Sequence, residues 1–499
     1  MRIYKPSLAL LTDLYEITMA YGYWKRQMAS DEAVFHLFFR KKPFEGGYAI
    51  AAGLEPVIEY LESWRFDSSD LDFLAQMKAP TGVPMFEEGF LRYLEDLSFS
   101  CDVMGMREGE VVFPYEPLLR IQGPLLQAQL LETPLLTLTN FPTLIATKAA
   151  RISLAAEGDS ILEFGLRRAQ GIDGGLSAAR AAFIGGCAAT SNTLAGKVYG
   201  IPVRGTHAHS WIMAFDHEKE AFQAYAEALP DNCVFLVDTY DTLDGVAHAI
   251  EVGKWLKARG KPFLGIRLDS GDIDYLSKES RKLLDAAGFP EAQIYASNEL
   301  CETLIRDLKA QGAKVAVWGV GTHLVTGQSQ PALGGVYKLS AIRKQGETKW
   351  KYRLKLSERM KKISDPGIIQ VRRFSLPENG GYRADALYDE GTDLSHGCSI
   401  VDPIDPTRRR KIGEEMVGRD LLVPIFEKGK RVYDLPTLPD IQAYAASQLA
   451  QFDNSIKRLH FPHSYPVGME EAYYQMKLEM IDAKRKELEK SPSYRRCAE

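Results

Sequence analysis

The chain has 499 residues, of which 45% are hydrophobic and 25% charged, and its formal net charge is −5 at pH 7. This length exceeds one ordinary domain and is sufficient to bury a large core. A mildly negative chain gives no electrostatic basis for nucleic acid or an anionic membrane as its main partner. We therefore expect a globular protein of more than one part that acts on small molecules.

Cysteine usage and apolar runs indicate the compartment. The six cysteines are scattered and form no CxxC pair, which favours reduced, buried thiols over a disulfide framework or a zinc knuckle. No segment near the N-terminus resembles a signal peptide, and no uninterrupted apolar run reaches about 18 residues. The sequence thus predicts a cytoplasmic protein.

The first part of the chain mixes helices and short strands. Helical spacing predicts a helix over 12–29, and the alternating aromatic segment 32–43 predicts a strand. The segments that follow are three amphipathic helices near 54–65, 68–78 and 85–97, a β-rich patch over 101–130, and one or two helices over 133–158.

From residue 160 the chain repeats a strand-then-helix unit. The expected strands are SILEFG, IPVRGT, CVFLVDT, FLGIRLD, QIYASN and VAVWGVG, with GVYKLSAI (335–342) as a seventh. Most are continuous apolar runs, which suit a parallel sheet covered on both faces, and a spacing of about 30 residues per unit suits βαβ crossovers. The pattern favours an irregular (β/α) barrel over an open doubly wound sheet. Residues 343–440 read as a smaller β-rich appendage, and 441–499 as a helical segment.

Polar residues gather where these strands end. The stretches are EFGLRR (163–168), TSN (190–192), RGTHAHS (204–210), VDTYD (237–241), RLDSGD (267–272), SNE (297–299), WGVGTH (318–323) and GGVYK (334–338). Because the carboxyl ends of parallel strands meet at one rim, these side chains are expected to lie together. A rim of carboxylates, guanidinium groups and glycine turns indicates an enzyme that acts on a phosphorylated sugar.

RLDSGD carries the sharpest single signal. Arg267 suits a phosphate or carboxylate through its two-pronged guanidinium group. Asp269 suits paired ribose hydroxyls, or Mg²⁺ bound with a diphosphate. Ser270 and Gly271 are expected to turn the chain so that backbone amides face the ligand; the alternative is a structural Arg–Asp pair with a helix cap.

Two glycine turns are candidates for binding anions. Gly319 and Gly321 let backbone N–H groups approach a phosphate, and Thr322 adds a hydroxyl. Gly334 and Gly335, followed by Lys338, offer a second anion pocket. The spacing is not GxGxxG with a downstream acid, which disfavours a nicotinamide-dinucleotide dehydrogenase.

The histidines of RGTHAHS are candidates for chemistry. His207 and His209 are flanked by Thr206 and Ser210. Asp238 and Asp241, at the next strand end, provide carboxylates that can hold one ring nitrogen and orient the other for nucleophilic work. The residues alone leave open which imidazole acts. Phe164 and Tyr15 are candidate aromatic contacts, and Arg167 and Arg168 are candidate anion clamps.

Taken in order, TDLYEITMAYGYW, EFGLRRAQG, GTHAHSW, VDTYDT, RLDSGD, GVGTHLVT and LGGVYKL resemble the nicotinate phosphoribosyltransferase family. The resemblance implies formation of nicotinate mononucleotide and diphosphate from nicotinate and 5-phosphoribosyl 1-diphosphate, coupled to ATP hydrolysis and served by Mg²⁺, as the first step of NAD biosynthesis from nicotinate. It also implies an ATP-dependent ligase that works as a homodimer with shared active sites. The implied fold is an N-terminal α/β sandwich over 1–150, an irregular α/β barrel carrying the site over 151–342, and the smaller C-terminal parts.

The resemblance also implies residue roles. His209 resembles the histidine that ATP phosphorylates, and Asp238 its orienting carboxylate. The remaining implied contacts are Tyr15, Phe164 and Thr206 for nicotinate, Arg267 and Asp269 for the substrate anion and ribose, Gly321 and Thr322 for the 5′-phosphate, and Arg167 for nicotinate or diphosphate. No protein metal site is expected.

Four rival functions remain. A nicotinamide phosphoribosyltransferase is disfavoured because Asn192 stands where an Asp would accept from the amide, and a quinolinate phosphoribosyltransferase is typically much shorter. A catalytically inactive binding or scaffold protein on the same fold is the third rival. A Schiff-base aldolase is the fourth rival and is disfavoured because no Lys lies at a core strand end among residues 160–325.

Overall fold

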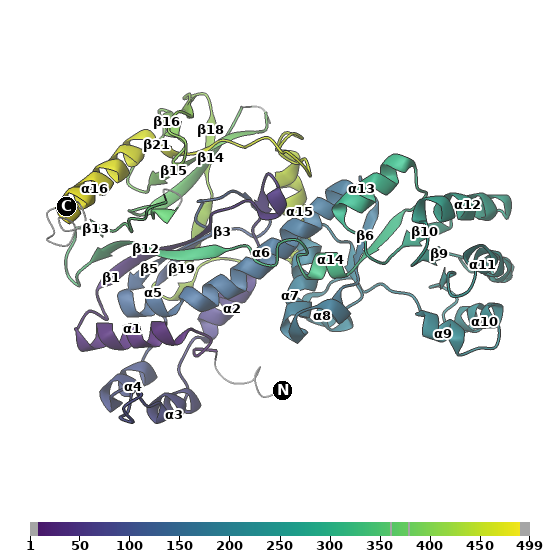
Figure 1. Cartoon of the computed structure of the whole chain (residues 1–499), viewed down its shortest axis with the longest axis horizontal. Helices are drawn as coiled ribbons and strands as arrows, with labels where there is room; N and C mark the ends of the chain where they lie inside the picture. The colour runs from purple at the N-terminus through teal and green to yellow at the C-terminus, as the bar shows by residue number, and fades with distance from the viewer. Residues whose placement is uncertain (1–7, 360–361, 378–379, 490–499) are drawn as a thin grey trace, which may run out of the picture. The chain divides into compact units, whose positions relative to one another are not determined.

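The computed structural model describes residues 8–359, 362–377 and 380–489. They form two compact units (Figure 1). Unit 1 contains the chain up to Phe141, residues Leu333–Pro436 and the chain from Ser447 onward, and unit 2 contains Pro142–Ala332 and Thr437–Ala446. The chain passes from one unit to the other inside helix α6 (Glu132–Ala155), next to Pro142. The four-part division at residues 150, 342 and 440 stays a prediction.

The first sheet of unit 1 is antiparallel, with the strand order β13-β12-β1-β5-β3-β19-β20. Its strands are β1 (Glu32–Phe39), β3 (Asp102–Met106), β5 (Leu119–Pro124), β12 (Gly335–Arg343), β13 (Lys351–Tyr352), β19 (Leu422–Glu427) and β20 (Lys430–Arg431). The prediction of GVYKLSAI as a seventh barrel strand was wrong, because β12 pairs antiparallel with β1. The rings of Phe35 and Tyr337 stack with their centroids 4.8 Å apart, which adds packing that sequence periodicity does not reveal.

The second sheet of unit 1 has the order β17-β16-β21-β15-β14-β18. Its strands are β14 (Ile369–Ser375), β15 (Tyr382–Asp389), β16 (Cys398–Val401), β17 (Arg409–Ile412), β18 (Val417–Asp420) and β21 (Val467–Glu470). Arg373 is buried here, and its guanidinium group lies 2.6 Å from the carboxylates of both Glu110 and Asp385. A short pair, β2 (Ala49–Ile50) and β4 (Val111–Val112), completes the strands described in this unit.

Helices cover parts of unit 1 close to the predicted positions. They are α1 (Leu14–Lys25), α2 (Leu54–Ser63), α3 (Ser68–Gln76), α4 (Glu88–Glu95), α5 (Leu125–Leu130), α16 (Glu471–Glu489) and the short 3-10 turn η2 (Pro43–Glu45). Asp67 starts α3 because its carboxylate accepts the backbone N–H groups of Ser69 and Asp70. The β-rich patch expected over 101–130 ends earlier than predicted, since its last six residues form the buried helix α5.

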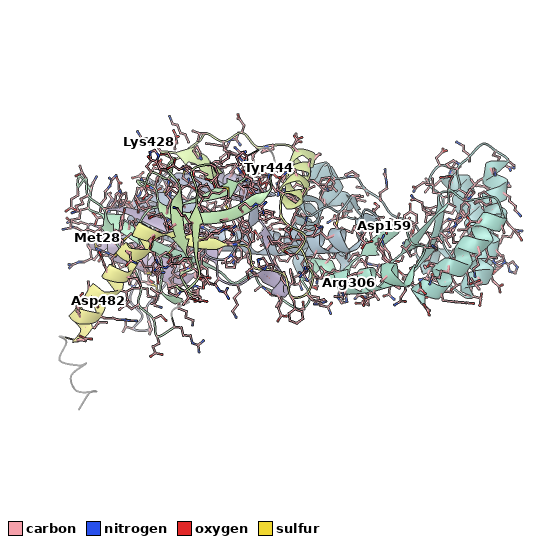
Figure 2. All side chains as sticks on the ribbon, turned by 90° about the horizontal axis from the view of Figure 1, so that it is seen from above. Met28, Asp159, Arg306, Lys428, Tyr444 and Asp482 are labelled. Carbon is pink, nitrogen blue, oxygen red and sulfur yellow. The ribbon has the colours of Figure 1, made fainter. Side chains whose placement is uncertain are left out.

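Unit 2 is built around parallel strands in the order β7-β6-β11-β10-β9-β8. They are β6 (Ser160–Glu163), β7 (Ala189–Thr190), β8 (Val234–Leu236), β9 (Gly265–Leu268), β10 (Gln293–Ala296) and β11 (Val317–Val320). Trp318 is buried in β11, and its indole N–H donates to the carboxylate of Asp159 at 3.0 Å. Asp159 is labelled in Figure 2. IPVRGT was expected as a full strand, but it makes one bridge, between Thr190 and Val203.

The helices of unit 2 alternate with its strands. Besides the second part of α6, they are α7 (Gly171–Ile184), α8 (Thr193–Tyr199), α9 (His209–Met213), α10 (Glu218–Ala228), α11 (Thr242–Lys257), α12 (Ile273–Ala286), α13 (Glu302–Gln311), α14 (Thr322–Val325), the start of α15 (Leu438–Ala450) and the 3-10 turn η3 (Leu166–Arg168). This alternation brings the carboxyl ends of the strands to one edge of the sheet.

Chain-wide features agree with the sequence where the structure describes them. Within the described residues, no helix has both the length and the apolar character needed to cross a membrane. The five cysteines in the described ranges are free thiols, three of them buried and two half-buried. Cys497 lies outside the described residues.

Candidate active site

The predicted gathering of polar residues at the strand ends is present in unit 2. Phe164 follows β6, Asp238 follows β8, Asp269 follows β9, and Gly321 follows β11. These strands are parallel and in register, since Gly265 pairs with both Gln293 and Val234. The groups that follow them therefore lie along one edge of the sheet.

His209 stands at the centre of this cluster, at the first residue of α9. Its Nδ1 lies 3.1 Å from the hydroxyl of Thr239. Its Nε2 lies 3.7 Å from a carboxylate oxygen of Asp269 and 4.0 Å from one of Asp238. The side chain is 39% exposed, so the ring is held by neighbours and is still accessible to a ligand.

Asp238, after β8, accepts hydrogen bonds from the residues that follow β9. Its Oδ2 accepts the backbone N–H of Asp269 at 2.9 Å and the hydroxyl of Ser270 at 2.6 Å. Its side chain is 1% exposed, and its Oδ1, the atom nearest His209, has no hydrogen-bond partner among the described residues. A buried carboxylate oxygen without a partner costs free energy, which indicates that this oxygen serves a ligand or the imidazole.

Asp269 is held in place from a third strand end. The hydroxyl of Ser297, after β10, donates to its Oδ1, while its Oδ2 faces His209. Gly271 follows with φ at +80°, a left-handed conformation that glycine adopts without strain, and so turns the chain into α12. Thr239 and Ser297 lay in stretches that the sequence singled out, but neither was assigned a role.

Arg267 holds the loop that carries both histidines. Its Nη1 donates to the hydroxyl of Thr206 at 2.6 Å, and its Nη2 donates to the backbone carbonyl of His207 at 3.0 Å. Its Nε is buried and has no partner among the described residues. Burial lowers the pKa of the guanidinium group, and the carboxylates of Asp269 and Asp238 oppose this shift. The sequence predicted an anion contact for Arg267 and missed its role in positioning this loop.

His207 is a packing residue. It is 8% exposed, and its Nε2 accepts the backbone N–H of Leu236 at 3.3 Å. The rings of Tyr225, Phe222 and Phe235 surround it, with centroids 4.9 to 6.4 Å away. Burial, followed by the nearby Arg267 charge, lowers the pKa of the imidazole to about 4, so it is neutral near pH 7. Its Nε2 is occupied by the backbone and its Nδ1 is buried, which leaves His209 as the reactive candidate.

The glycines after β11 make room for an aromatic ring. A Cβ on Gly319 would lie 2.7 Å from the ring of Phe164, and one on Gly321 would lie 3.2 Å from the carbonyl oxygen of Phe164. Gly319 therefore allows the Phe164 ring to approach the strand, a role that differs from the predicted phosphate contact. Thr322 begins α14 directly after this turn.

Glu163 supports the turn that carries Phe164 and Arg167, and the sequence analysis missed it. Its buried carboxylate accepts the hydroxyl of Thr190 at 2.5 Å and the backbone N–H of Gly165. Burial raises the pKa of this carboxyl group. Arg167 lies on η3 with its charge close enough to Arg267 to lower the pKa of that residue. The sequence signal that could have identified Glu163 is a carboxylate at the end of an otherwise largely apolar strand.

Two predicted roles need correction. Asp241 was expected in the catalytic set, but its carboxylate caps α11 by accepting the backbone N–H groups of Leu243 and Asp244, each at 3.0 Å. Asn192 was taken as a determinant of selectivity between acid and amide substrates. It is 2% exposed; its Oδ1 accepts the backbone N–H of Ala195, and its Nδ2 donates to the carbonyl of Gly175. Its amide group is occupied in capping α8 and in the contact with Gly175, and therefore does not serve to select between acid and amide substrates.

The other predicted residues have simpler positions. Thr206 lies in the Arg267 contact described above, and Ser210 is exposed in the first turn of α9. Tyr15, Gly334 and Gly335 belong to unit 1, so their relation to the His209 cluster stays a prediction.

Within unit 1, Tyr15 and Lys338 share Glu132 as a neighbour. Partial burial and the charge of Glu132 raise the pKa of Tyr15 to about 12, and Lys338 lies 3.9 Å from the Glu132 carboxylate. Lys338 also has Arg40 and Lys355 close enough to lower its pKa, although burial is the larger cause. The anion pocket predicted at Lys338 thus has two further cations that the sequence analysis did not single out. Gly335 is needed where it is because a Cβ would lie 2.1 Å from the Asn140 side chain.

The carboxylates at the strand ends bear on metal binding. No group of three or more His, Cys, Asp or Glu side chains that could hold a metal ion is found among the described residues. The unpartnered oxygen of Asp238 and the outward oxygen of Asp269 are hard donors of the kind that Mg²⁺ prefers. Such a pair fits Mg²⁺ that arrives with a diphosphate and does not fit a dedicated protein cage.

The chain is similar to known proteins along most of its length. Family models described as the nicotinate phosphoribosyltransferase N-terminal domain, family and C-terminal domain match residues 10–140, 160–364 and 370–477. A nicotinate phosphoribosyltransferase of Bacillus subtilis is 46% identical over 478 residues, which are 95% of each chain. One of Mycobacterium tuberculosis is 41% identical over 463 residues, covering 92% of this chain and 91% of the relative.

Solved structures confirm the predicted fold class. The crystal structure of human nicotinic acid phosphoribosyltransferase is 32% identical, with a TM-score of 0.81, and the match covers 94% of this chain and 99% of the human one. A nicotinate-nucleotide pyrophosphorylase from Pyrococcus furiosus shares the fold, with a TM-score of 0.67 at 23% identity over 91% of this chain and 99% of that one. The parallel sheet, the antiparallel β unit and the match along nearly the whole chain lead to one conclusion: this chain belongs to the nicotinate phosphoribosyltransferase family.

Proposed function

We propose that the protein joins nicotinate to 5-phosphoribosyl 1-diphosphate, forming nicotinate mononucleotide and diphosphate, and that ATP hydrolysis drives the reaction through a phosphate carried by His209. The observation that carries the proposal is the setting of His209, an accessible imidazole with Asp238 and Asp269 on one side and Thr239 on the other. The names of the relatives supply the substrate class. The reaction would be the first step of NAD biosynthesis from nicotinate.

The two nitrogens of His209 suit different tasks. The carboxylates of Asp238 and Asp269 near Nε2 favour a proton on that nitrogen. The Nδ1 lone pair, which meets the Thr239 hydroxyl, is then the nucleophile toward the γ-phosphorus of ATP. The new N–P bond forms as the bond to ADP breaks, and water later releases inorganic phosphate. A phosphorylated His209 adds roughly two negative charges beside the site, which shifts its relative affinity for substrate and product.

The sugar step needs positive charge on one side and control of the ribose on the other. As the nicotinate nitrogen bonds to C1 of the ribose, the C1–O bond to diphosphate breaks and negative charge grows on the leaving group. We expect Arg167 and the guanidinium group of Arg267, whose charges lie close to each other, to act where that charge develops. Asp269 and Asp238 would hold Mg²⁺ together with the diphosphate, and the bound ion would supply Lewis-acid stabilisation of its charge. Phe164 is the proposed face for the pyridine ring.

Assembly and location follow the family resemblance. We propose a homodimer with shared active sites, as that resemblance implies, and a cytoplasmic location. Sedimentation analysis of the purified protein tests the first, and fractionation of cells tests the second.

The test is a steady-state assay with nicotinate, nicotinamide and quinolinate, each with and without ATP. The proposal expects the highest kcat/KM for nicotinate and an increase with ATP. Preference for nicotinamide or quinolinate would overturn the substrate assignment, and no response to ATP would overturn the coupling. No turnover with any of the three would favour the inactive scaffold protein.

A further inference from the structure

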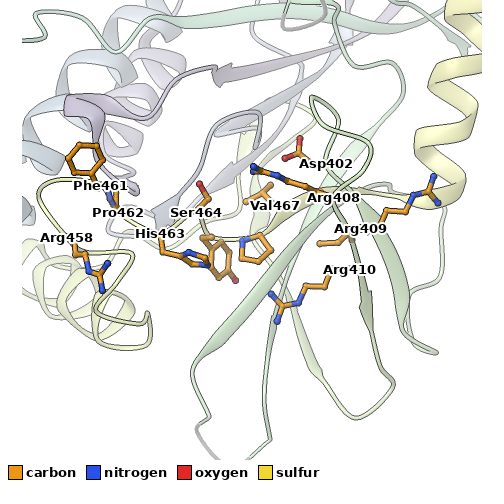
Figure 3. Close-up of a pocket in the computed structure, with 14 residues that line it drawn as sticks. Asp402, Arg408, Arg409, Arg410, Arg458, Phe461, Pro462, His463, Ser464 and Val467 are labelled. Carbon is orange, nitrogen blue, oxygen red and sulfur yellow. The ribbon is translucent and has the colours of Figure 1, made fainter.

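A cavity in unit 1 is lined by several positively charged side chains that the proposed reaction does not use. It has a volume of about 650 Å³ and lies between β16, β17, β21 and the loop of residues 458–466 (Figure 3). We call it the arginine groove. Its charged lining consists of Arg408, Arg409, Arg410, Arg458 and Asp402.

Two of the four arginines have carboxylate partners. Arg408 lies 3.1 Å from Asp405, and Arg409 lies 2.6 Å from Glu471 on α16. Among the described residues, no carboxylate lies within ion-pair distance of Arg410 or Arg458. The carboxylate of Asp402 accepts the backbone N–H groups of Ile404 and Asp405, so it serves its own turn. The groove therefore has two guanidinium groups available to an anion.

The geometry of β17 explains which arginines face the groove. Side chains alternate between the two faces of a strand, so Arg410 shares a face with Ile412, and Arg409 points the other way. Ile412 and Ile400 are buried in the core beneath this sheet, and Ile400 also lines the groove. Figure 3 shows Arg409 projecting away from Arg410, consistent with its ion pair to Glu471. The core thus sets the direction in which Arg410 projects.

The opposite wall is an ordered loop that presents an aromatic ring. The backbone N–H of His463 donates to the carbonyl of Ser455 at 2.9 Å, and Ile456 packs so closely on Gly47 that a Cβ there would lie 2.0 Å from its carbonyl oxygen. Phe461 is 96% exposed and has φ at +47°, a conformation that bulky residues rarely adopt. An exposed ring held in such a backbone indicates a contact surface for a ligand.

A third cation lies at the edge of the groove. The ammonium group of Lys42 donates to the hydroxyl of Ser464, one of the lining residues, at 3.3 Å. Burial lowers the pKa of Lys42. An anion close to Ser464 would therefore gain a partner in Lys42 as well.

We propose that the arginine groove binds a nucleoside triphosphate at a site separate from the His209 cluster. Guanidinium groups pair well with phosphate oxygens, so Arg410 and Arg458 hold the phosphate chain. The base stacks on the ring of Phe461, as bases do on exposed aromatic side chains. The volume lies in the range of small-molecule sites, about 300–1,000 Å³.

The test is equilibrium dialysis of the full-length protein with radiolabelled ATP, comparing wild type with the double variant Arg410→Gln, Arg458→Gln. The expected result is that the double variant binds one ATP fewer per chain, or binds that ATP at least tenfold more weakly. The matched control is Lys411→Gln, which removes a neighbouring exposed cation of β17 that does not line the groove and is expected to keep wild-type binding. Because the readout is a difference between variants, it holds whether or not His209 also uses ATP.

Two further arms define the ligand. Phe461→Ala is expected to weaken binding of ATP and leave binding of inorganic triphosphate unchanged. Equal binding of ATP by wild type and the double variant, with matched thermal unfolding, would overturn the proposal. A change in sedimentation mass of the double variant without a change in ATP binding would also overturn it and identify the groove as a contact between copies of the chain.

Discussion

His207 and His209 are separated by a single residue, and their surroundings differ in burial and in partners. His207 sits among aromatic rings with its Nε2 on a backbone amide, whereas His209 is 39% exposed between a hydroxyl and two carboxylates. The residues alone left the choice open, because spacing does not tell which side chain turns inward, and it was the family resemblance that selected His209. The packing of Phe222, Tyr225 and Phe235 makes that choice.

The low pKa of His207 predicts how the free energy of unfolding depends on pH. Its pKa of about 4 in the folded protein lies below the ordinary value of about 6.5, so the unfolded chain takes up the proton first as the pH falls. Stability is therefore lost between about pH 6.5 and pH 4, and this residue accounts for up to about 3 kcal/mol. Urea unfolding at several pH values is expected to show a shallower pH dependence for His207→Gln, which keeps an acceptor for Leu236. Parallel curves for the two proteins would contradict this.

Arg267→Lys tests the two-pronged contact that holds the histidine loop. A lysine ammonium cannot reach both the Thr206 hydroxyl and the His207 carbonyl with the same geometry. We expect kcat/KM to fall roughly 10- to 100-fold. Arg281→Lys is the matched control, since Arg281 on α12 also makes a two-pronged contact, in which it donates to the carbonyls of Ala292 and Phe289. Equal kinetics for Arg267→Lys and wild type would remove Arg267 from the site.

At the scale of elements, the sequence predicted five of the six strands described in the unit 2 sheet, because they are short apolar runs that end in polar residues. It missed β7 and expected a strand at IPVRGT instead. It failed where a partner strand decides the outcome. GVYKLSAI resembles the barrel strands in composition, but only its pairing with β1 shows that it belongs to unit 1. The roles predicted for Asp241 and Asn192 were wrong for a related reason. A polar residue after a strand can cap the next helix or act in the site, and only the backbone hydrogen bonds show that these two cap helices.

Gly319→Ala tests how β11 shapes the site. The added methyl group would lie 2.7 Å from the Phe164 ring and 3.3 Å from Ser297, so the ring must move. We expect KM for nicotinate to rise by about tenfold or more, an energy of about 1.4 kcal/mol. Gly174→Ala in α7 is the control, because its new Cβ has no neighbour closer than 4.0 Å. An unchanged KM in Gly319→Ala would show that the Phe164 ring does not bind the pyridine.

At the scale of the whole molecule, unit 1 depends on a buried ionic network. Arg373 contacts Glu110 and Asp385 with no exposed side-chain surface, and Arg419 adds a second contact to Glu110 at 2.8 Å. The network joins residues that are more than 250 positions apart in the chain. No local sequence pattern reports it, because each member reads as an ordinary surface charge.

Replacing Arg373 is expected to lower the free energy of unfolding by several kcal/mol, about 3–5. Arg373→Met leaves the buried carboxylate of Asp385 without its arginine and leaves Glu110 with Arg419 alone. Breaking a buried ion pair in this way typically costs about 3–5 kcal/mol of stability. Arg372→Met, at the adjacent position, breaks a half-exposed pair with Asp420 and is expected to cost about 1 kcal/mol or less. Urea unfolding of the two variants measures the difference. Equal losses would show that the buried network contributes no more than the surface pair.

The central claim is that His209 receives phosphate from ATP at the joined strand ends, and protein labelling with [γ-³²P]ATP and Mg²⁺ tests it most directly. We expect acid-labile label on the wild type and on His207→Gln, and none on His209→Ala. Label that persists in His209→Ala, or that disappears only in His207→Gln, would contradict the account.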